Sequence, residues 1–227
     1  MPFFSPKLFS IVFIGRQNPQ ILNHDFLINN RVLPTKREPF KSLLRNSSEK
    51  TPPFTQFLST PVVTTLVYKW ISIIAEESRF QIKDNNFGVP SKSPIISITK
   101  KYFGEHLKYT PFQLGGINFA GELNFANEND EIAFDKKLGI DCKTFANYFK
   151  IEEKVQYSTK LNYPLNEDQV ELRVDKSKKN QEKAMLNFNF EFTYDDIDSF
   201  IGKLDEVDEV YKIFKEILKK LKTEINK

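Results

Sequence analysis

The chain has 227 residues, of which 40% are hydrophobic and 28% charged, and its formal net charge is +3 at pH 7. These values are ordinary for a globular protein, and the length allows a substantial core in one large domain or two small ones. The single cysteine, Cys142, excludes an internal disulfide framework and indicates a reducing compartment, so we expect a cytoplasmic protein.

The first apolar run, Leu8–Gly15, has one lysine before it and is followed at once by Arg16. It is too short to span a membrane and lacks the small-residue cleavage site of a signal peptide, so we expect no membrane association. Within this run, Phe9–Ile14 carries apolar residues on both faces. That pattern predicts a strand in the centre of a sheet.

Residues 16–61 show no clear hydrophobic period and contain six prolines. We therefore predict a long, proline-punctuated loop over about residues 16–61, in which Ile21–Ile28 forms a helical turn. Between Arg31 and Lys50 this loop holds six basic residues against two acidic ones, so it is also basic.

The middle of the chain alternates between strand and helix signals. Runs rich in β-branched and aromatic residues predict strands, and Ser93 followed by Pro94 combines a good N-cap with a good first helical residue. The elements expected here are the strands Val62–Trp70, Ile71–Lys83 and Phe112–Phe125, a helix from Ser93, and a short helix at Cys142–Phe149.

The last part of the chain carries the clearest periodicity. Three runs predict an antiparallel meander, at Val155–Tyr163, Val170–Asp175 and Ala184–Tyr194. From about Asp196 to Asn226, apolar residues recur at steps of three and four, which is helical spacing. The apolar stripe is wider than a coiled-coil seam, so we expect this amphipathic helix to cover a sheet.

Together these elements predict an α+β fold with an extended, mostly antiparallel sheet of about seven strands and helices on one face. A long amphipathic helix closes the chain. We see no interdomain linker, and we therefore expect a single domain over residues 1–227.

Residues suited to catalysis are few. Two histidines and one cysteine show no metal-ligand spacing, and no glycine-rich phosphate loop occurs, so we predict no catalytic, cofactor-binding or metal-binding residue. The nearest approach to a metal-dependent nuclease is Asp141 with Glu152 and Lys154, a pattern that chance readily produces in so charged a chain. The acids at 195, 196 and 198 fit helix capping better than cation binding.

Two kinds of macromolecular binding remain. Basic residues interleaved with aromatic ones can contact phosphates and stack on bases, and the candidates are Arg16, Arg31, Arg37, Lys41 and Arg45. The final turns of the C-terminal helix can instead present apolar residues to a protein partner, and these are Leu218, Leu221 and Ile225.

Several segments resemble a sporadically distributed bacterial family of α+β proteins with no assigned activity. They are the opening strand Phe9–Gly15, the strand pair around Trp70 and Phe80, the segment Thr110–Phe119, and the closing strand and helix. The resemblance covers the order of elements across most of the chain and includes no catalytic motif. Such families often lie in genome islands of variable content, which implies conflict with phages or plasmids.

We therefore predict a non-enzymatic macromolecule-binding protein without a cofactor. It would serve as a protein-interaction subunit of a bacterial or mobile-element system, with anti-phage defence as one form. The alternative is a nucleic-acid-binding accessory protein that uses the basic 16–50 segment.

Overall fold

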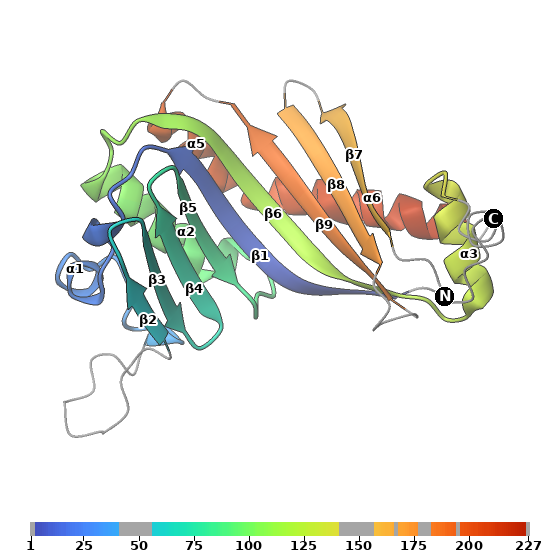
Figure 1. The fold of residues 1–227 in the computed structure, drawn as a ribbon, viewed down its shortest axis with the longest axis horizontal. Coiled ribbons are helices and arrows are strands. Elements are labelled where there is room, and N and C mark those ends of the chain that lie inside the picture. Colours follow the sequence, from blue (N-terminus) through green and yellow to red (C-terminus); the bar gives the residue numbers. More distant parts are fainter. Residues whose placement is uncertain are drawn as a thin grey trace. The chain divides into compact units, whose positions relative to one another are not determined.

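The structure is a computed structural model that describes residues 3–40, 56–140, 157–165, 168–176, 183–193 and 196–225. Over these residues the protein is α+β, with nine strands in one sheet of order β2-β3-β4-β5-β1-β6-β9-β8-β7 (Figure 1). The pairs β1–β5, β2–β3, β3–β4, β4–β5 and β7–β8 are antiparallel. The predicted class and the antiparallel sheet are confirmed, whereas about seven strands was an undercount.

The strands are β1 (Phe3–Gly15), β2 (Gln56–Ser59), β3 (Val63–Tyr68), β4 (Ile71–Glu76), β5 (Arg79–Asp84), β6 (Phe112–Asn124), β7 (Tyr157–Leu165), β8 (Asp168–Lys176) and β9 (Lys183–Phe192). The α-helices of the described residues are α1 (His24–Asn29), α2 (Pro94–Lys101), α3 (Glu128–Lys137), α5 (Ile197–Lys203) and α6 (Val207–Ile225). A π-helical turn, Tyr102–His106, continues α2.

The undercount arose where the sequence gives weak turn signals. β4 and β5 are joined by Glu77 and Ser78, a connection without the glycine, proline or asparagine that usually marks a hairpin. The single run predicted at Ile71–Lys83 is therefore two strands. β2 lies in the proline-rich segment, and its side chains are all exposed. Its sequence therefore lacks the alternation of apolar and polar residues that would have predicted a strand.

Helix starts were easier to predict than helix lengths. Ser93 caps α2 as expected, because its hydroxyl accepts a hydrogen bond from the amide of Ile95, and Pro94 opens the helix. The Ser93 hydroxyl also donates to Oδ2 of Asp84 at 2.5 Å, which ties this helix start to the end of β5.

Helix α3 was not predicted, because it shows little amphipathic pattern. It buries one aromatic residue, Phe134, beside two acidic residues, Glu131 and Asp135. The helix predicted at Cys142–Phe149 lies outside the described residues.

The C-terminal helix is not continuous from Asp196, as predicted, but is interrupted by a 3₁₀ turn at Leu204–Glu206. Residues three apart eclipse one another in a 3₁₀ helix, so this turn keeps both Leu204 and Val207 on the buried side. The capping role predicted for the acidic start is confirmed at Asp196, whose Oδ1 accepts a hydrogen bond from the amide of Ser199 at 2.7 Å. This hydrogen bond lowers the pKa of Asp196 below its usual value.

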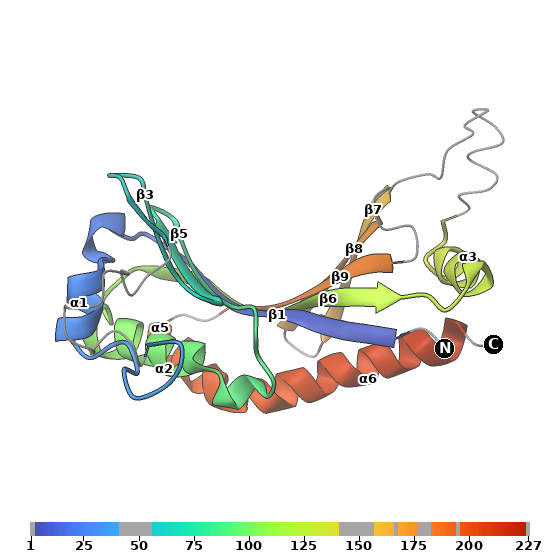
Figure 2. The same ribbon diagram turned by 90° about the horizontal axis from the view of Figure 1, so that it is seen from below.

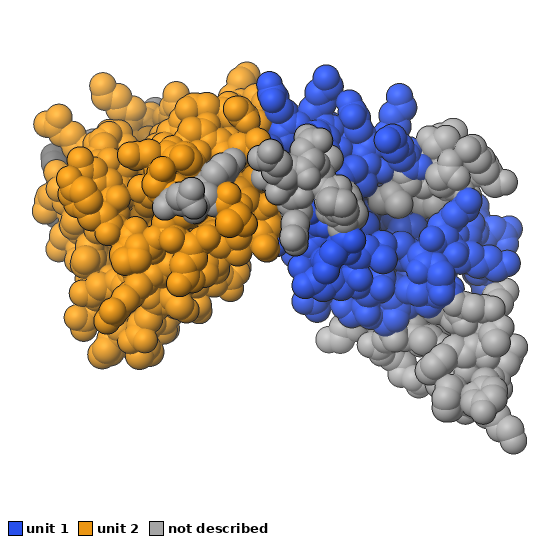
Figure 3. Space-filling model, turned by 90° about the horizontal axis from the view of Figure 1, so that it is seen from above, with its two compact units in different colours: residues 1–7, 119–189, 209–227 blue, residues 8–118, 190–208 orange. Residues whose placement is uncertain are grey.

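The chain forms two compact units, each built from more than one stretch of sequence (Figure 3). Unit 1 comprises residues 1–7, 119–189 and 209–227, and unit 2 comprises residues 8–118 and 190–208. Strands β1, β6 and β9 and helix α6 therefore contribute residues to both units.

In unit 2, a row of aliphatic residues crosses four strands. Leu66, Ile73, Ile82 and Ile11 lie opposite one another in register, and all four are fully buried. The burial of each such side chain contributes about 1.5–3 kcal/mol. β1 lies between β5 and β6 and has the central place that its two apolar faces predicted.

In unit 1, the ring of Phe214 on α6 lies within 5.5 Å of the rings of Phe4, Phe119 and Phe188, measured between centroids. These three residues come from β1, β6 and β9, so α6 packs along one face of these strands (Figure 2). No helix within the described ranges combines the length and the apolarity that crossing a membrane requires.

Candidate functional site

Helix α6 forms one wall of a groove in unit 1. The groove has a volume of about 310 Å³ and lies between α6 and the first residues of β1. Its lining, which we call the α6 groove, consists of Phe4, Pro6, Tyr211, Phe214, Lys215, Leu218 and Lys219.

The floor and the rim of the α6 groove differ in polarity. Phe4, Phe214 and Leu218 are buried, whereas Lys215 and Lys219 are exposed. The ammonium group of Lys215 lies 4.8 Å from the centroid of the Tyr211 ring, a cation–π contact. Partial burial raises the pKa of Tyr211 above its usual value, so its hydroxyl stays neutral at physiological pH.

Of the three residues predicted to bind a protein, Leu218 lies in the lining of this groove. Its side chain is 7% exposed and is packed into the floor. The side chains of Leu221 and Ile225 lie outside the described residues. The expected exposure of Leu218 is therefore not found, because its side chain is buried; that the end of this helix binds a protein stays a prediction.

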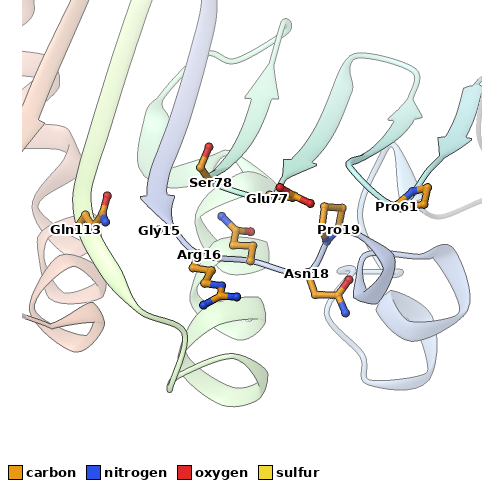
Figure 4. Close-up of a pocket in the computed structure, with 9 residues that line it drawn as sticks. Gly15, Arg16, Asn18, Pro19, Pro61, Glu77, Ser78 and Gln113 are labelled. Atoms are coloured by element: carbon orange, nitrogen blue, oxygen red, sulfur yellow. The ribbon is translucent and has the colours of Figure 1, made fainter.

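A second cavity, of about 470 Å³, lies in unit 2 at the end of β1 (Figure 4). We call it the β1-end pocket, and it is lined by Gly15, Arg16, Gln17, Asn18, Pro19, Pro61, Glu77, Ser78 and Gln113. Figure 4 shows Glu77 and Ser78 at the turn that follows β4, beside the end of β1, with Gln113 on the neighbouring strand β6.

Backbone contacts hold the wall of the β1-end pocket in place. The amide of Gly15 donates to the carbonyl of Ser78 at 3.1 Å, and that of Gln17 donates to the carbonyl of Glu77 at 2.7 Å. A Cβ atom at residue 15 would overlap the carbonyl oxygen of Pro111, so only glycine allows this close approach.

The side-chain amide of Gln17 is buried at this wall, and neither its nitrogen nor its oxygen has a hydrogen-bond partner within the described part of the protein. Leaving a buried donor or acceptor unpaired costs about 1–3 kcal/mol, so such groups call for an explanation. Gln17 was missed in the sequence, where nothing distinguishes it from other surface amides.

The basic residues predicted to contact nucleic acid do not share one described site. Arg16 lies in the β1-end pocket, whereas Arg31 follows α1, where its carbonyl accepts from the Lys101 ammonium group at 3.1 Å. Arg16, Arg31 and Arg37 are exposed, and none forms an ion pair with a described residue. Lys41 and Arg45 lie outside the described residues.

A buried ionic cluster lies elsewhere in unit 1. Lys176 at the end of β8 reaches Oε1 of Glu131 and Oδ2 of Asp135, at 2.7 Å in each case. The hydroxyl of Tyr157 donates to the other oxygen of Asp135 at 2.6 Å. The i,i+4 spacing of the two acids was the available signal, and it was overlooked because α3 was not predicted.

Among the described residues, no three or more histidine, cysteine, aspartate or glutamate side chains come close enough together to hold a metal ion. His24 instead contacts the hydroxyl of Tyr68, with 3.2 Å between Nδ1 and Oη. The pattern of Asp141, Glu152 and Lys154, which the sequence did not favour as a metal site, lies outside the described residues, as does Cys142.

No family model matches the chain, and a search of curated proteins also gives no match. The α6 groove, the β1-end pocket and the charges around them are the features of the described residues that bear on function.

Proposed function

We propose that this protein is a non-enzymatic binding protein that holds a segment of a protein partner in the α6 groove. The observation that carries the proposal is the pairing of an apolar floor with a cationic rim. Phe4, Phe214 and Leu218 form the floor, and Lys215 and Lys219 stand at the edge.

This arrangement favours a partner segment of matching chemistry. A groove beside a helix recognises apolar anchors that project from one face of a short segment. Lysines on the rim attract carboxylates and repel basic sequences, which gives selectivity and speeds association more than it adds affinity. The expected segment therefore carries one or two large apolar side chains flanked by aspartate or glutamate.

A peptide-display selection against the purified full-length protein tests the proposal. We expect the enriched peptides to share an aromatic or aliphatic anchor with acidic neighbours. Binding of such a peptide should be lost in the double variant Lys215→Glu, Lys219→Glu, because both rim charges are reversed. Both side chains are exposed, so the variant should keep its fold.

Lys212 provides the matched control, since it is exposed on the same helix but does not line the groove. Lys212→Glu should leave binding of the selected peptide within about twofold of wild type at moderate salt, because a charge away from the contact is screened. Enrichment of basic peptides, or equal binding by the double variant and wild type, would show the proposal to be wrong.

Nucleic-acid binding is the second candidate function. It is favoured by the exposure of Arg16, Arg31 and Arg37 without a described carboxylate partner. Affinity for single-stranded DNA should then fall steeply between low and moderate salt, because phosphate contacts release counterions. An absence of binding by the wild-type protein at low salt would exclude this candidate.

A further inference from the structure

The two strands at the ends of the sheet differ in how they are protected against pairing with a further strand. In the order of the described strands, β2 stands at one end and β7 at the other (Figure 1). Natural edge strands carry lysine, proline or a bulge, because their outer main-chain groups otherwise pair with another strand. β7 carries Lys160 and Pro164. β2 carries neither residue type, and its register with β3 runs from residue 56 to residue 59 without a bulge.

The side chains around β2 are exposed and apolar. The exposed fractions are 47% for Phe57, 49% for Leu58 and 57% for Val62, so three of the eight large hydrophobic side chains exposed in the described residues lie within six positions. Residues 51–68 contain no charged side chain, in a chain whose charged content is 28%. An uncharged, apolar edge of this kind is typical of a site of association.

The hydrogen bonds of the β2–β3 hairpin define which main-chain groups of β2 point outward. The amide of Thr60 donates to the carbonyl of Val63 at 2.8 Å, so the main-chain groups of Thr60 point toward the β3 side. Along an antiparallel pair, residues alternate between those whose N–H and C=O groups point at the partner strand and those whose groups point away from it. The main-chain groups of Leu58 therefore point at β3, and those of Ser59 point away from it.

From these observations we propose that β2 pairs with β2 of a second copy of this protein, so that the two sheets join across a twofold axis. The absence of charge favours a second copy over a segment of another protein. Two antiparallel copies of β2 bring no like charges together, and the apolar side chains of each cover those of the other. β2 also offers no charge by which it would select a charged segment. The strand has only four residues, so the expected dimer is weak and concentration-dependent.

This inference goes beyond the proposed function and does not depend on it. β2 belongs to unit 2, whereas the residues that line the α6 groove belong to unit 1. Since the two surfaces share no residue, a variant that loses the dimer should still bind the peptide selected for the α6 groove.

Sedimentation equilibrium of the full-length protein over a range of concentrations is the first measurement. We expect the average mass to rise with concentration from 26.6 kDa toward twice that value. Leu58→Lys should raise the dissociation constant of the dimer at least about 10-fold, because it places a charge on each of the paired strands. Leu161→Lys is the control. It puts the same charge on β7, at a side chain that is 39% exposed, and should change the dissociation constant by less than about twofold.

Ser59 tests whether the main chain takes part in the pairing. Ser59→Pro removes the outward amide and should abolish the dimer, while it spares the hydrogen bonds between β2 and β3. Ser59→Ala loses the hydroxyl contact with Thr64 at 2.9 Å but keeps the amide, so it should dimerise like wild type. Circular dichroism of each variant confirms that the fold is kept.

The wild-type protein offers a further test that needs no substitution. The Ser59 amide should exchange with deuterium more slowly at high than at low protein concentration, whereas exchange of the Leu58 amide should change little. The proposal is overturned if the protein stays monomeric up to about 1 mM, which would leave the β2 edge to a segment of another protein. It is also overturned if Leu58→Lys and Leu161→Lys affect the dimer equally, or if Ser59→Pro dimerises like wild type.

Discussion

The ammonium group of Lys176 lies 2.7 Å from Oδ2 of Asp135, and both side chains are more than nine-tenths buried. Lys176 also contacts Glu131 at 2.7 Å, so one cation at the end of β8 joins two acids on α3. Charges removed from water are tolerated only when they are paired in this way. The contact attaches a helix with few apolar residues to the sheet.

Replacing Lys176 with methionine should therefore destabilise the protein by about 3–5 kcal/mol, because two buried carboxylates lose their counterion. Urea unfolding followed by circular dichroism measures the change. Lys183→Met is the control: that lysine is 40% exposed and pairs with Glu122 at 3.3 Å, so its loss should cost about 0–1 kcal/mol. Equal costs for the two variants would contradict the assigned role of Lys176.

His24 should make the stability of the protein depend on pH. Burial lowers the pKa of His24 below its usual value of 6.5, and the charge of Asp25 opposes this effect only in part. Between the two pKa values the unfolded chain binds more protons, so stability is full above about pH 6.5 and falls as pH drops toward the folded-state pKa.

The measurement is urea unfolding at a series of pH values, with His24→Gln as the comparison. Glutamine can still hydrogen-bond to Tyr68 but does not titrate, so the variant should lose the His24 part of the pH dependence. If the two proteins show the same loss of stability between about pH 7 and pH 5, His24 is not its source.

Gly115 of β6 should resist substitution because Phe200 occupies the space beside it. A Cβ atom at residue 115 would overlap the Phe200 ring, which is 1% exposed and stacks on Phe112. Gly115→Ala should cost about 1–3 kcal/mol, as overpacked cores do.

A double-mutant cycle checks this cause. In a Phe200→Leu background the cost of Gly115→Ala should shrink, because the smaller side chain leaves room for the methyl group. Gly88→Ala is the control, since no heavy atom lies within 4 Å of its Cβ position. Its unfolding free energy should stay within about 0.5 kcal/mol of wild type. An unchanged cost of Gly115→Ala in the Phe200→Leu background would rule out the ring as the obstacle.

Phe214 of α6 should be sensitive to truncation. It contacts aromatic rings from β1, β6 and β9 and is 1% exposed, so Phe214→Ala should cost about 3–5 kcal/mol. Met185 on β9 is 41% exposed, and Met185→Ala should cost no more than about 0.5 kcal/mol. Thermal and urea unfolding of both variants compares the two positions, and a cost below about 1 kcal/mol for Phe214→Ala would contradict its central place in unit 1.

Local pattern was enough for several elements of the fold. The alternation from Ala184 to Phe192 predicted β9, and Ser93 followed by Pro94 predicted the start of α2. Asp196 was correctly predicted to cap a helix. Each of these features depends on neighbours within a few residues, which the sequence displays directly.

Contacts between residues far apart in the sequence could not be predicted from local patterns. Nothing near Lys176 in the sequence indicates that its partners are Glu131 and Asp135, and nothing near Gln17 indicates a buried amide. The place of Leu218 in the lining of a groove depends on Phe4 and Pro6, more than two hundred residues away in the chain.

The sequence by itself determined which residues prefer strands and helices and which faces of these elements are apolar, because propensity and periodicity are local. The tertiary structure alone decided that β1 lies between β5 and β6 and that β9 follows β6. It also decided which charges are buried together and which polar atoms stay unpaired. These outcomes depend on which strands pair and on which polar groups are removed from water when segments far apart in the sequence come together. Local sequence patterns do not contain this information.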